Sequence, residues 1–313
     1  MQNTELRPLG AGEILDRAVT LFVRRFVPLV VVLAAAIVPV LILEAVIAPG
    51  STRLIGDMGA LITASGRAQS TSAIETLTKD QGGAAQYFFV IAISYATRIL
   101  MWSAILAVAS SAYAGASTSL GAAYRVGVRK WFPQAVVAIA FFIVAMLCAV
   151  PFFIAYLIAI AGVVALSALH ATVVAVIFGV IAGLVMFGWI ALAGSWVFMT
   201  YQVASAALVI EDAGPVAAIT AGVRRTLSRQ TFWRTVLGGM ILFAVTQGAV
   251  VLFAVVGIAL SSLTHIPALS FAILGGGQIV VDGLLAVFVV VFVTDLRVRR
   301  EGLDLVALSS LPG

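Results

Sequence analysis

Charged residues are scarce in this chain. Of its 313 residues, 10% are charged and 63% are hydrophobic, whereas a soluble domain carries about 25% charged residues at its surface. The chain has too few charges to coat a water-soluble body of its size. This shortage predicts an integral membrane protein, and the apolar stretches leave no soluble segment that could form a second core. We therefore expect a single membrane domain over residues 1–313.

Cysteine and histidine are almost missing as well. The one cysteine, Cys148, lies in an apolar run, which excludes a disulfide framework and a thiolate metal cluster. The two histidines, His170 and His265, both fall in short turns between apolar runs. No phosphate-binding loop, zinc-protease motif or acyl-transfer triad stands out. The sequence therefore predicts no catalytic residue, no metal and no cofactor.

Long apolar runs are what the chain has in abundance. A bilayer core about 30 Å thick is crossed by roughly 20 residues of helix. By this measure the sequence predicts six transmembrane helices, over residues 26–48, 87–114, 134–166, 172–202, 236–260 and 269–293. The connecting segments are then 1–25, 49–86, 115–133, 203–235 and 294–313. The expected fold is an all-α polytopic bundle, in which short helices such as Ala73–Lys79 cover the outer loop 49–86 or that loop stays mobile.

The lysines and arginines are distributed unevenly along the chain. Most of the 18 lie in segments 1–25, 115–133, 203–235 and 294–313. Because basic residues collect on the cytoplasmic side of membrane proteins, both termini are predicted to lie in the cytoplasm, with the chain in the inner membrane. The same asymmetry accounts for the net charge of +5 without any nucleic-acid partner.

Three of these cytoplasmic segments look alike. Each has helical periodicity and contains a valine followed by two basic residues, at positions 23, 128 and 223. This pattern predicts amphipathic helices at the membrane surface, with basic groups facing anionic headgroups. The candidate headgroup-facing residues are Arg24, Arg25, Arg129, Lys130, Arg224 and Arg225. Two explanations stay open: a threefold repeat of helix plus transmembrane hairpin, or the ordinary placement of basic residues before inbound spans.

The two ends of the chain carry a resemblance to a known family. The opening Glu5–Ala18 (ELRPLGAGEILDRA) and the closing Asp295–Leu305 (DLRVRREGLDL) resemble a bacterial family named for the membrane domain of glycerophosphoryl diester phosphodiesterases. The resemblance implies the membrane part alone, because the soluble barrel with its paired histidines and metal-binding carboxylates is missing. In the two-domain enzymes this part would present lipid-derived substrates or anchor the catalyst. No catalytic residue is carried over.

A few polar residues lie inside the predicted spans. Asp282 falls near the middle of 269–293, with Gln278 four residues earlier on the same helical face. Gln247 comes at a similar depth in 236–260, Arg98 lies somewhat outward of the middle of 87–114, and Glu44 lies near the outer end of 26–48. A charge at the bilayer centre costs at least about 2.5–3.5 kcal/mol, so such groups should face the bundle or water. We expect these residues to form a polar seam, which serves either as a structural clasp or as a pathway for a substrate, ion or proton. For Glu44 a further alternative is that its side chain reaches water at the membrane interface.

These observations favour a non-enzymatic bundle that binds lipid or a membrane partner. It would serve as an accessory or scaffold subunit, in a larger complex or a homo-oligomer. The alternative is a secondary transporter or channel that uses Asp282 and Arg98. In that case Gly275–Gly277 would break the last helix beside the acid, rather than allow close helix packing. A membrane-embedded enzyme acting on lipid headgroups is a third alternative, supported only by Glu211 and Asp212.

Overall fold

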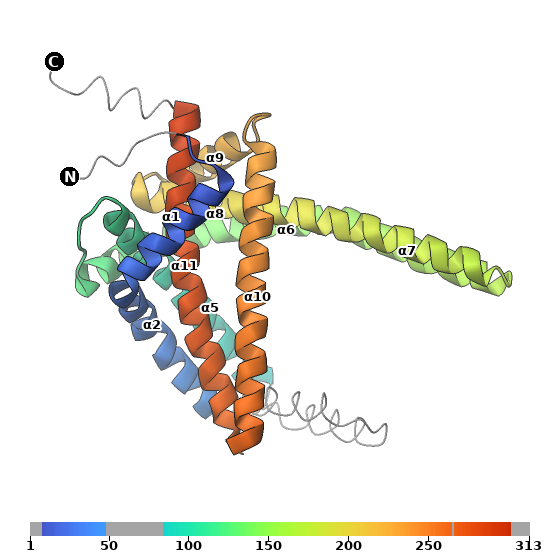
Figure 1. Cartoon of the computed structure of the whole chain (residues 1–313), viewed down its shortest axis with the longest axis horizontal. Helices are drawn as coiled ribbons and strands as arrows, with labels where there is room; N and C mark the ends of the chain where they lie inside the picture. The colour runs from blue at the N-terminus through green and yellow to red at the C-terminus, as the bar shows by residue number, and fades with distance from the viewer. Residues whose placement is uncertain (1–7, 48–83, 265, 302–313) are drawn as a thin grey trace. The chain divides into compact units, whose positions relative to one another are not determined.

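The computed structural model describes residues 8–47, 84–264 and 266–301. Every regular element in this part of the chain is helical, and six helices are long and apolar enough to cross a membrane. The all-α, multi-pass membrane fold predicted from hydropathy is confirmed. The elements are α1 (Ala11–Arg24), α2 (Phe26–Ile47), α5 (Ala84–Tyr113), α6 (Leu120–Ala168), α7 (Thr172–Trp189), η1 (Ile190–Gly194), α8 (Ser195–Ile210), α9 (Pro215–Thr226), α10 (Phe232–Thr264) and α11 (Pro267–Glu301) (Figure 1).

Most of the observed long helices exceed the spans predicted for them, whereas α2 matches its span closely. α6 has 49 residues, α10 has 33 and α11 has 35, so each exceeds the roughly 20 residues that the bilayer core requires. The fourth span is one continuous helical run of α7, the five-residue π-helix η1 and α8. The proposed helix Ala73–Lys79, most of the loop 49–86 and the tail beyond residue 301 lie outside the described residues.

The described residues divide into two compact units. Unit 1 comprises 12–47, 84–131, 244–264 and 266–292, and unit 2 comprises 8–11, 132–243 and 293–301. Helices α1, α6, α10 and α11 each contribute residues to both units.

Unit 1 is assembled around close helix contacts. In α1, the residues buried at helical spacing are Ile14, Ala18 and Phe22, which form one apolar stripe. Gly283 of α11 admits the ring of Phe22, because a Cβ at this glycine would lie 2.9 Å from the ring. The Tyr124 hydroxyl donates to the carbonyl of Val32 at 2.6 Å. The apolar face of α1 is therefore covered by protein, which differs from the expectation that it faces the membrane.

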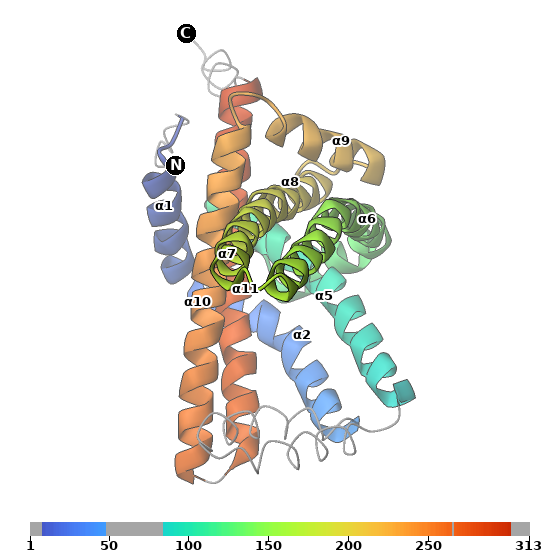
Figure 2. The same ribbon diagram turned by 90° about the vertical axis from the view of Figure 1, so that its right-hand side faces the viewer.

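Unit 2 contains the long hairpin of α6 and α7. The two helices run side by side in both views (Figures 1 and 2), and the turn between them contains His170 with φ +59°. The Trp189 indole donates to the carbonyl of Cys148 at 3.0 Å. Gln134, fully buried at the base of α6, donates to Tyr201 and Ser205 of α8 at 3.0 and 2.8 Å.

The long helices differ sharply in burial. In the most apolar 18-residue window of each helix, 83% of residues are buried for α11, compared with 11% for α6 and 6% for the run of α7 to α8. A long helix that is apolar on all sides and unburied is suited to lipid. Among the described helices, the hairpin of α6 and α7, together with the equally unburied α10, therefore has the exposed apolar surface that suits lipid.

The three similar segments do not form three equal helices. The first is a separate helix, α1, with a turn at Arg25 before α2. The third is α9, which ends in a short turn before α10. The middle segment runs on without a break as the start of α6. Pro133 is accommodated inside the helix.

Candidate functional site

Unit 1 contains a partly open cavity of about 200 Å³, with a mostly apolar lining into which a few polar and charged residues are set. Helices α2, α5, α10 and α11 line it. The side of α10 is apolar, with Val250 and Phe253, and α5 adds Ser94 and Thr97. The charged and amide residues around the cavity are Glu44, Arg98, Gln278 and Asp282. Four of the five residues proposed for the polar seam therefore lie around one space.

Asp282 is the most buried of these polar groups. It is 8% exposed, and Gln278 Nε2 donates to its Oδ1 at 2.7 Å. The two residues are four apart on α11, which places them on one helical face. Within the described part of the chain, this is the one hydrogen bond that the Asp282 side chain makes. The second carboxylate oxygen therefore stays available to a molecule in the cavity.

Arg98 lines the same cavity from α5 but stays exposed. It lies close enough to Asp282 to interact with it through space. Among the described residues, however, Arg98 forms no ion pair within 4.0 Å with either Asp282 or Glu44. A structural clasp requires such direct contact, because only close pairing offsets the cost of burying the charges. The charges are instead spaced around the cavity.

The fifth seam residue is placed elsewhere. Gln247 is exposed on α10 and is not among the cavity residues, so its assignment to the seam was wrong. Val250 and Phe253, on a different face of the same helix, line the cavity instead. The depth of a residue in a span does not determine which side of the helix its side chain faces, because successive side chains are rotated by about 100° around the helix axis.

The glycine triplet packs helices together and does not break α11. The helix continues through Gly275–Gly277. A Cβ at Gly275 would collide with Leu41 of α2, and one at Gly277 with the Phe253 ring of α10. Gly276 faces open space. Close helix packing through small residues, one of the two alternatives left open by the sequence, is the one observed.

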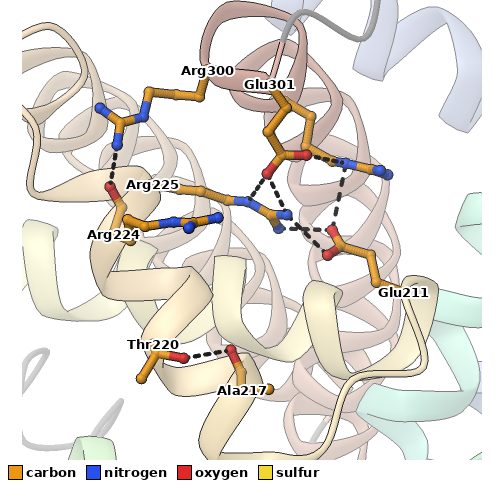
Figure 3. Close-up of polar contacts among 8 residues, drawn as sticks. Glu211, Ala217, Thr220, Arg224, Arg225, Arg300 and Glu301 are labelled. Atoms are coloured by element: carbon orange, nitrogen blue, oxygen red, sulfur yellow. Dashed lines mark hydrogen bonds and ion pairs between the residues drawn. The ribbon is translucent and has the colours of Figure 1, made fainter. Parts of the chain in front are cut away.

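Unit 2 holds a different kind of polar site, a cluster of paired charges. The guanidinium of Arg225 lies between the carboxylates of Glu211 and Glu301 (Figure 3). Its two Nη atoms donate to Glu211 at 2.7 and 2.9 Å, and Nε and Nη2 donate to Glu301 at 2.9 and 2.6 Å. Arg297 adds a further ion pair to each glutamate, at 3.6 and 3.1 Å. The cluster contains two positive and two negative groups and balances its own charge.

The pKa values in this cluster follow from the pairing. Burial alone lowers the pKa of Arg225, but the hydrogen bonds that its guanidinium donates to Glu211 and Glu301 outweigh this effect, so the pKa is raised. For Glu301 burial acts to raise the pKa, yet the hydrogen bonds from Arg225 and Arg297 hold it below the ordinary value of 4.5. Both shifts favour the charged forms at neutral pH.

A second charged cluster joins the two ends of the chain within unit 2. The Asp295 side chain is fully buried and accepts hydrogen bonds from Arg234 at 3.0 Å, Arg299 at 3.0 Å and the Leu9 backbone N–H at 2.7 Å. The carbonyl of Leu9 in turn accepts hydrogen bonds from Arg299, at 2.8 Å, and from Arg234. The terminal segments that carry the family resemblance are therefore bound to each other. Sequence reasoning missed this contact; its only signal was the acidic Asp295 in a basic run.

The six basic residues predicted to face headgroups divide into two sets. Arg24, Arg129 and Arg224 are exposed, and Arg25 is half-buried. Arg225 and Lys130 are buried, so for them the prediction was wrong. Arg225 points inward because two carboxylates lie there to receive it.

Comparisons with known proteins give no further guidance. No protein-family model, no curated protein and no solved structure matches the chain. In the described residues, histidines, cysteines and carboxylates do not gather in a group of three or more that could hold a metal ion.

Proposed function

We propose that this protein is a membrane carrier whose ligand-binding site is the cavity of unit 1. The observation that carries the proposal is the spacing of Arg98, Glu44 and Asp282 around an open space instead of in contact. Ionisable side chains in a span are costly, and they are retained mainly where they bind a ligand or line a pathway. A purely structural role is better served by direct pairing, as unit 2 achieves with its own charges.

The proposal includes an orientation. Both termini lie on the cytoplasmic side of the inner membrane, as the distribution of lysine and arginine favours. Glu44, close to the end of α2, then lies toward the outer face, and Asp282 lies near the middle of the bilayer. A reporter fused to either terminus is expected to be active only in the cytoplasm.

Water access to the cavity can be tested with a pair of neighbouring residues on α5. Ser94 lines the cavity, whereas Tyr95 is 66% exposed on the outer surface of the helix. Each is replaced by cysteine in a Cys148→Ala background, and the protein in liposomes is treated with a membrane-impermeant, charged thiol reagent. Ser94→Cys is expected to react, because the cavity admits water, and Tyr95→Cys to resist, because it faces lipid.

The two variants lie at the same depth, so their difference reports the cavity and not the distance from the membrane surface. Equal resistance at both positions would show a dry, closed cavity and would remove the basis of the carrier proposal.

A second candidate function is supported by an apolar pocket in unit 2. This pocket has a volume of about 510 Å³ and lies between α6 and the run of α7, η1 and α8. Aromatic side chains dominate its lining: Phe141, Phe142, Phe152, Trp189, Phe198 and Tyr201. Such a pocket suits an acyl chain, and it favours a lipid-binding accessory subunit.

The accessory role predicts that lipid is retained in this pocket. Ala193→Phe fills it, because Ala193 is buried in its wall. Val185→Phe, at an exposed site on α7, serves as the control. Loss of co-purified lipid in the first variant alone would support this role, and unchanged lipid in both would count against it.

A further inference from the structure

The cavity of unit 1 presents charges of both signs to the same small space. Arg98 contributes a guanidinium, and Glu44 and Asp282 contribute carboxylates. With all three ionised, a purely anionic ligand would meet two like charges and a purely cationic ligand would meet one. Like charges brought together in a poorly solvated site repel strongly. A ligand that carries both signs of charge would pair with the guanidinium and the carboxylates at once, whereas a ligand of one sign would leave part of the lining unpaired.

We propose that the cavity binds a zwitterion, an inference that rests on the proposed function. The zwitterion is a molecule or headgroup with an ammonium group and an anionic oxygen group a few bonds apart. The ammonium lies between the carboxylates of Asp282 and Glu44. The anionic group accepts hydrogen bonds from Arg98, whose planar fork of donors matches phosphate and carboxylate oxygens.

The hydrogen bonds already formed around the cavity are consistent with this assignment. Gln278 donates to one oxygen of Asp282, which orients the carboxylate and leaves the other oxygen for an ammonium donor. Arg98 has five N–H donors, and it makes no ion pair with a described residue. The cationic end of a zwitterion would thus find a carboxylate already oriented by Gln278, and the anionic end would find a guanidinium without an ion pair to a described residue.

The size of the cavity limits the ligand further. At about 200 Å³ it is smaller than the 300–1,000 Å³ of sites for drug-sized molecules. It can enclose a headgroup but not a whole lipid. The zwitterion is therefore either a small soluble molecule or the headgroup of a lipid whose chains stay in the bilayer.

The test compares a zwitterion with its two halves. The intact protein in a neutral maltoside detergent is titrated with phosphoethanolamine, with ethanolamine as the cationic half and with ethyl phosphate as the anionic half. Binding is followed by calorimetry. Phosphoethanolamine is expected to bind at least about tenfold more tightly than either half, since hydrogen bonds to charged groups contribute about ten- to hundredfold each. A parallel titration with phosphatidylethanolamine in the same micelles shows whether the source is a lipid headgroup or a free molecule.

Two variants assign the ends of the ligand. Arg98→Gln should reduce phosphoethanolamine binding to the level of ethanolamine, and Asp282→Asn should reduce it to the level of ethyl phosphate. Gln247→Leu, which removes an exposed amide outside the cavity, should leave the affinity unchanged.

Binding of either half as tightly as the zwitterion, or no binding of phosphoethanolamine and its lipid, overturns the inference. If the zwitterion fails to bind in this way but Ser94→Cys reacts with the thiol reagent, the carrier proposal stands and only the zwitterion is rejected. Failure of Ser94→Cys to react would reject both.

Discussion

The charged residues of unit 2 and those of unit 1 are arranged in different ways. In unit 2, Arg225 contacts two carboxylates within 3 Å, and buried Asp295 receives three donors. In unit 1, Arg98, Glu44 and Asp282 surround a cavity and do not pair directly. The first arrangement satisfies every group with protein atoms, and the second leaves room for a ligand. Charge in this protein therefore pairs within the fold of one unit and lines a cavity in the other, where we propose that a ligand binds.

The largest effect is expected when a cation is removed from unit 2. Arg225→Leu leaves Glu211 and Glu301 facing each other with only Arg297 between them. Breaking a buried ion pair by removing one partner costs about 3–5 kcal/mol, and the partial exposure of both glutamates places the expected loss near the lower end, about 3 kcal/mol. Unfolding in mixed micelles measures it.

Arg224→Leu is the matched control, because Arg224 is the exposed neighbour on the same helix. Its free energy of unfolding should change by no more than about 0.5 kcal/mol. Equal losses in both variants would show that the Arg225 cluster contributes nothing of its own.

The glycines of α11 give the next largest contrast. Gly277→Ala forces a methyl group against the Phe253 ring and should destabilise the protein by about 1–3 kcal/mol through overpacking. Gly276→Ala, one residue away and facing open space, should stabilise it by about 0.5–1 kcal/mol through helix propensity. Thermal unfolding of the two variants compares them, and stabilisation by Gly277→Ala would contradict the packing described.

Removing a charge from unit 1 should affect stability far less than in unit 2. Asp282→Asn keeps a side chain of the same shape beside Gln278 and removes a costly intramembrane charge. We expect the free energy of unfolding to change by less than about 1 kcal/mol, while phosphoethanolamine binding falls to the level of ethyl phosphate. A loss of about 3 kcal/mol, as for Arg225→Leu, would show that Asp282 is a structural group.

The smallest effect is a pH dependence of unit 2. Because the pKa of Glu301 is lowered in the folded protein from 4.5, its contribution to stability is complete above about pH 5 and is lost as the pH falls through the folded pKa. The melting temperature should therefore fall below pH 4.5 in the unmodified protein and fall less steeply in Glu301→Gln. Identical profiles for the two proteins would contradict this pairing.

Hydropathy predicted the fold class well, because lipid imposes a simple rule of length and composition. The six apolar helices follow from this rule. It does not fix the rotation of a helix about its axis, and for that reason Gln247 was placed in the seam although it is exposed on α10.

The clusters of unit 2 could not be predicted from the sequence for a different reason. Arg225 meets Glu211 across 14 positions and Glu301 across 76, and Leu9 meets Asp295 across 286. Nothing in a local pattern distinguishes a buried arginine from the exposed Arg224 beside it. The distinction arises only when α9 packs on α8, with Gly222 close against Ala204.

The central claim is that the charges of unit 1 surround a cavity that a ligand can occupy. An experimental density map of the protein in lipid nanodiscs tests this claim most directly. We predict ordered water or ligand density between Arg98 and Asp282, with no direct contact between the guanidinium and the carboxylate. A dry, direct ion pair between these two side chains, with no space around it, would contradict the account.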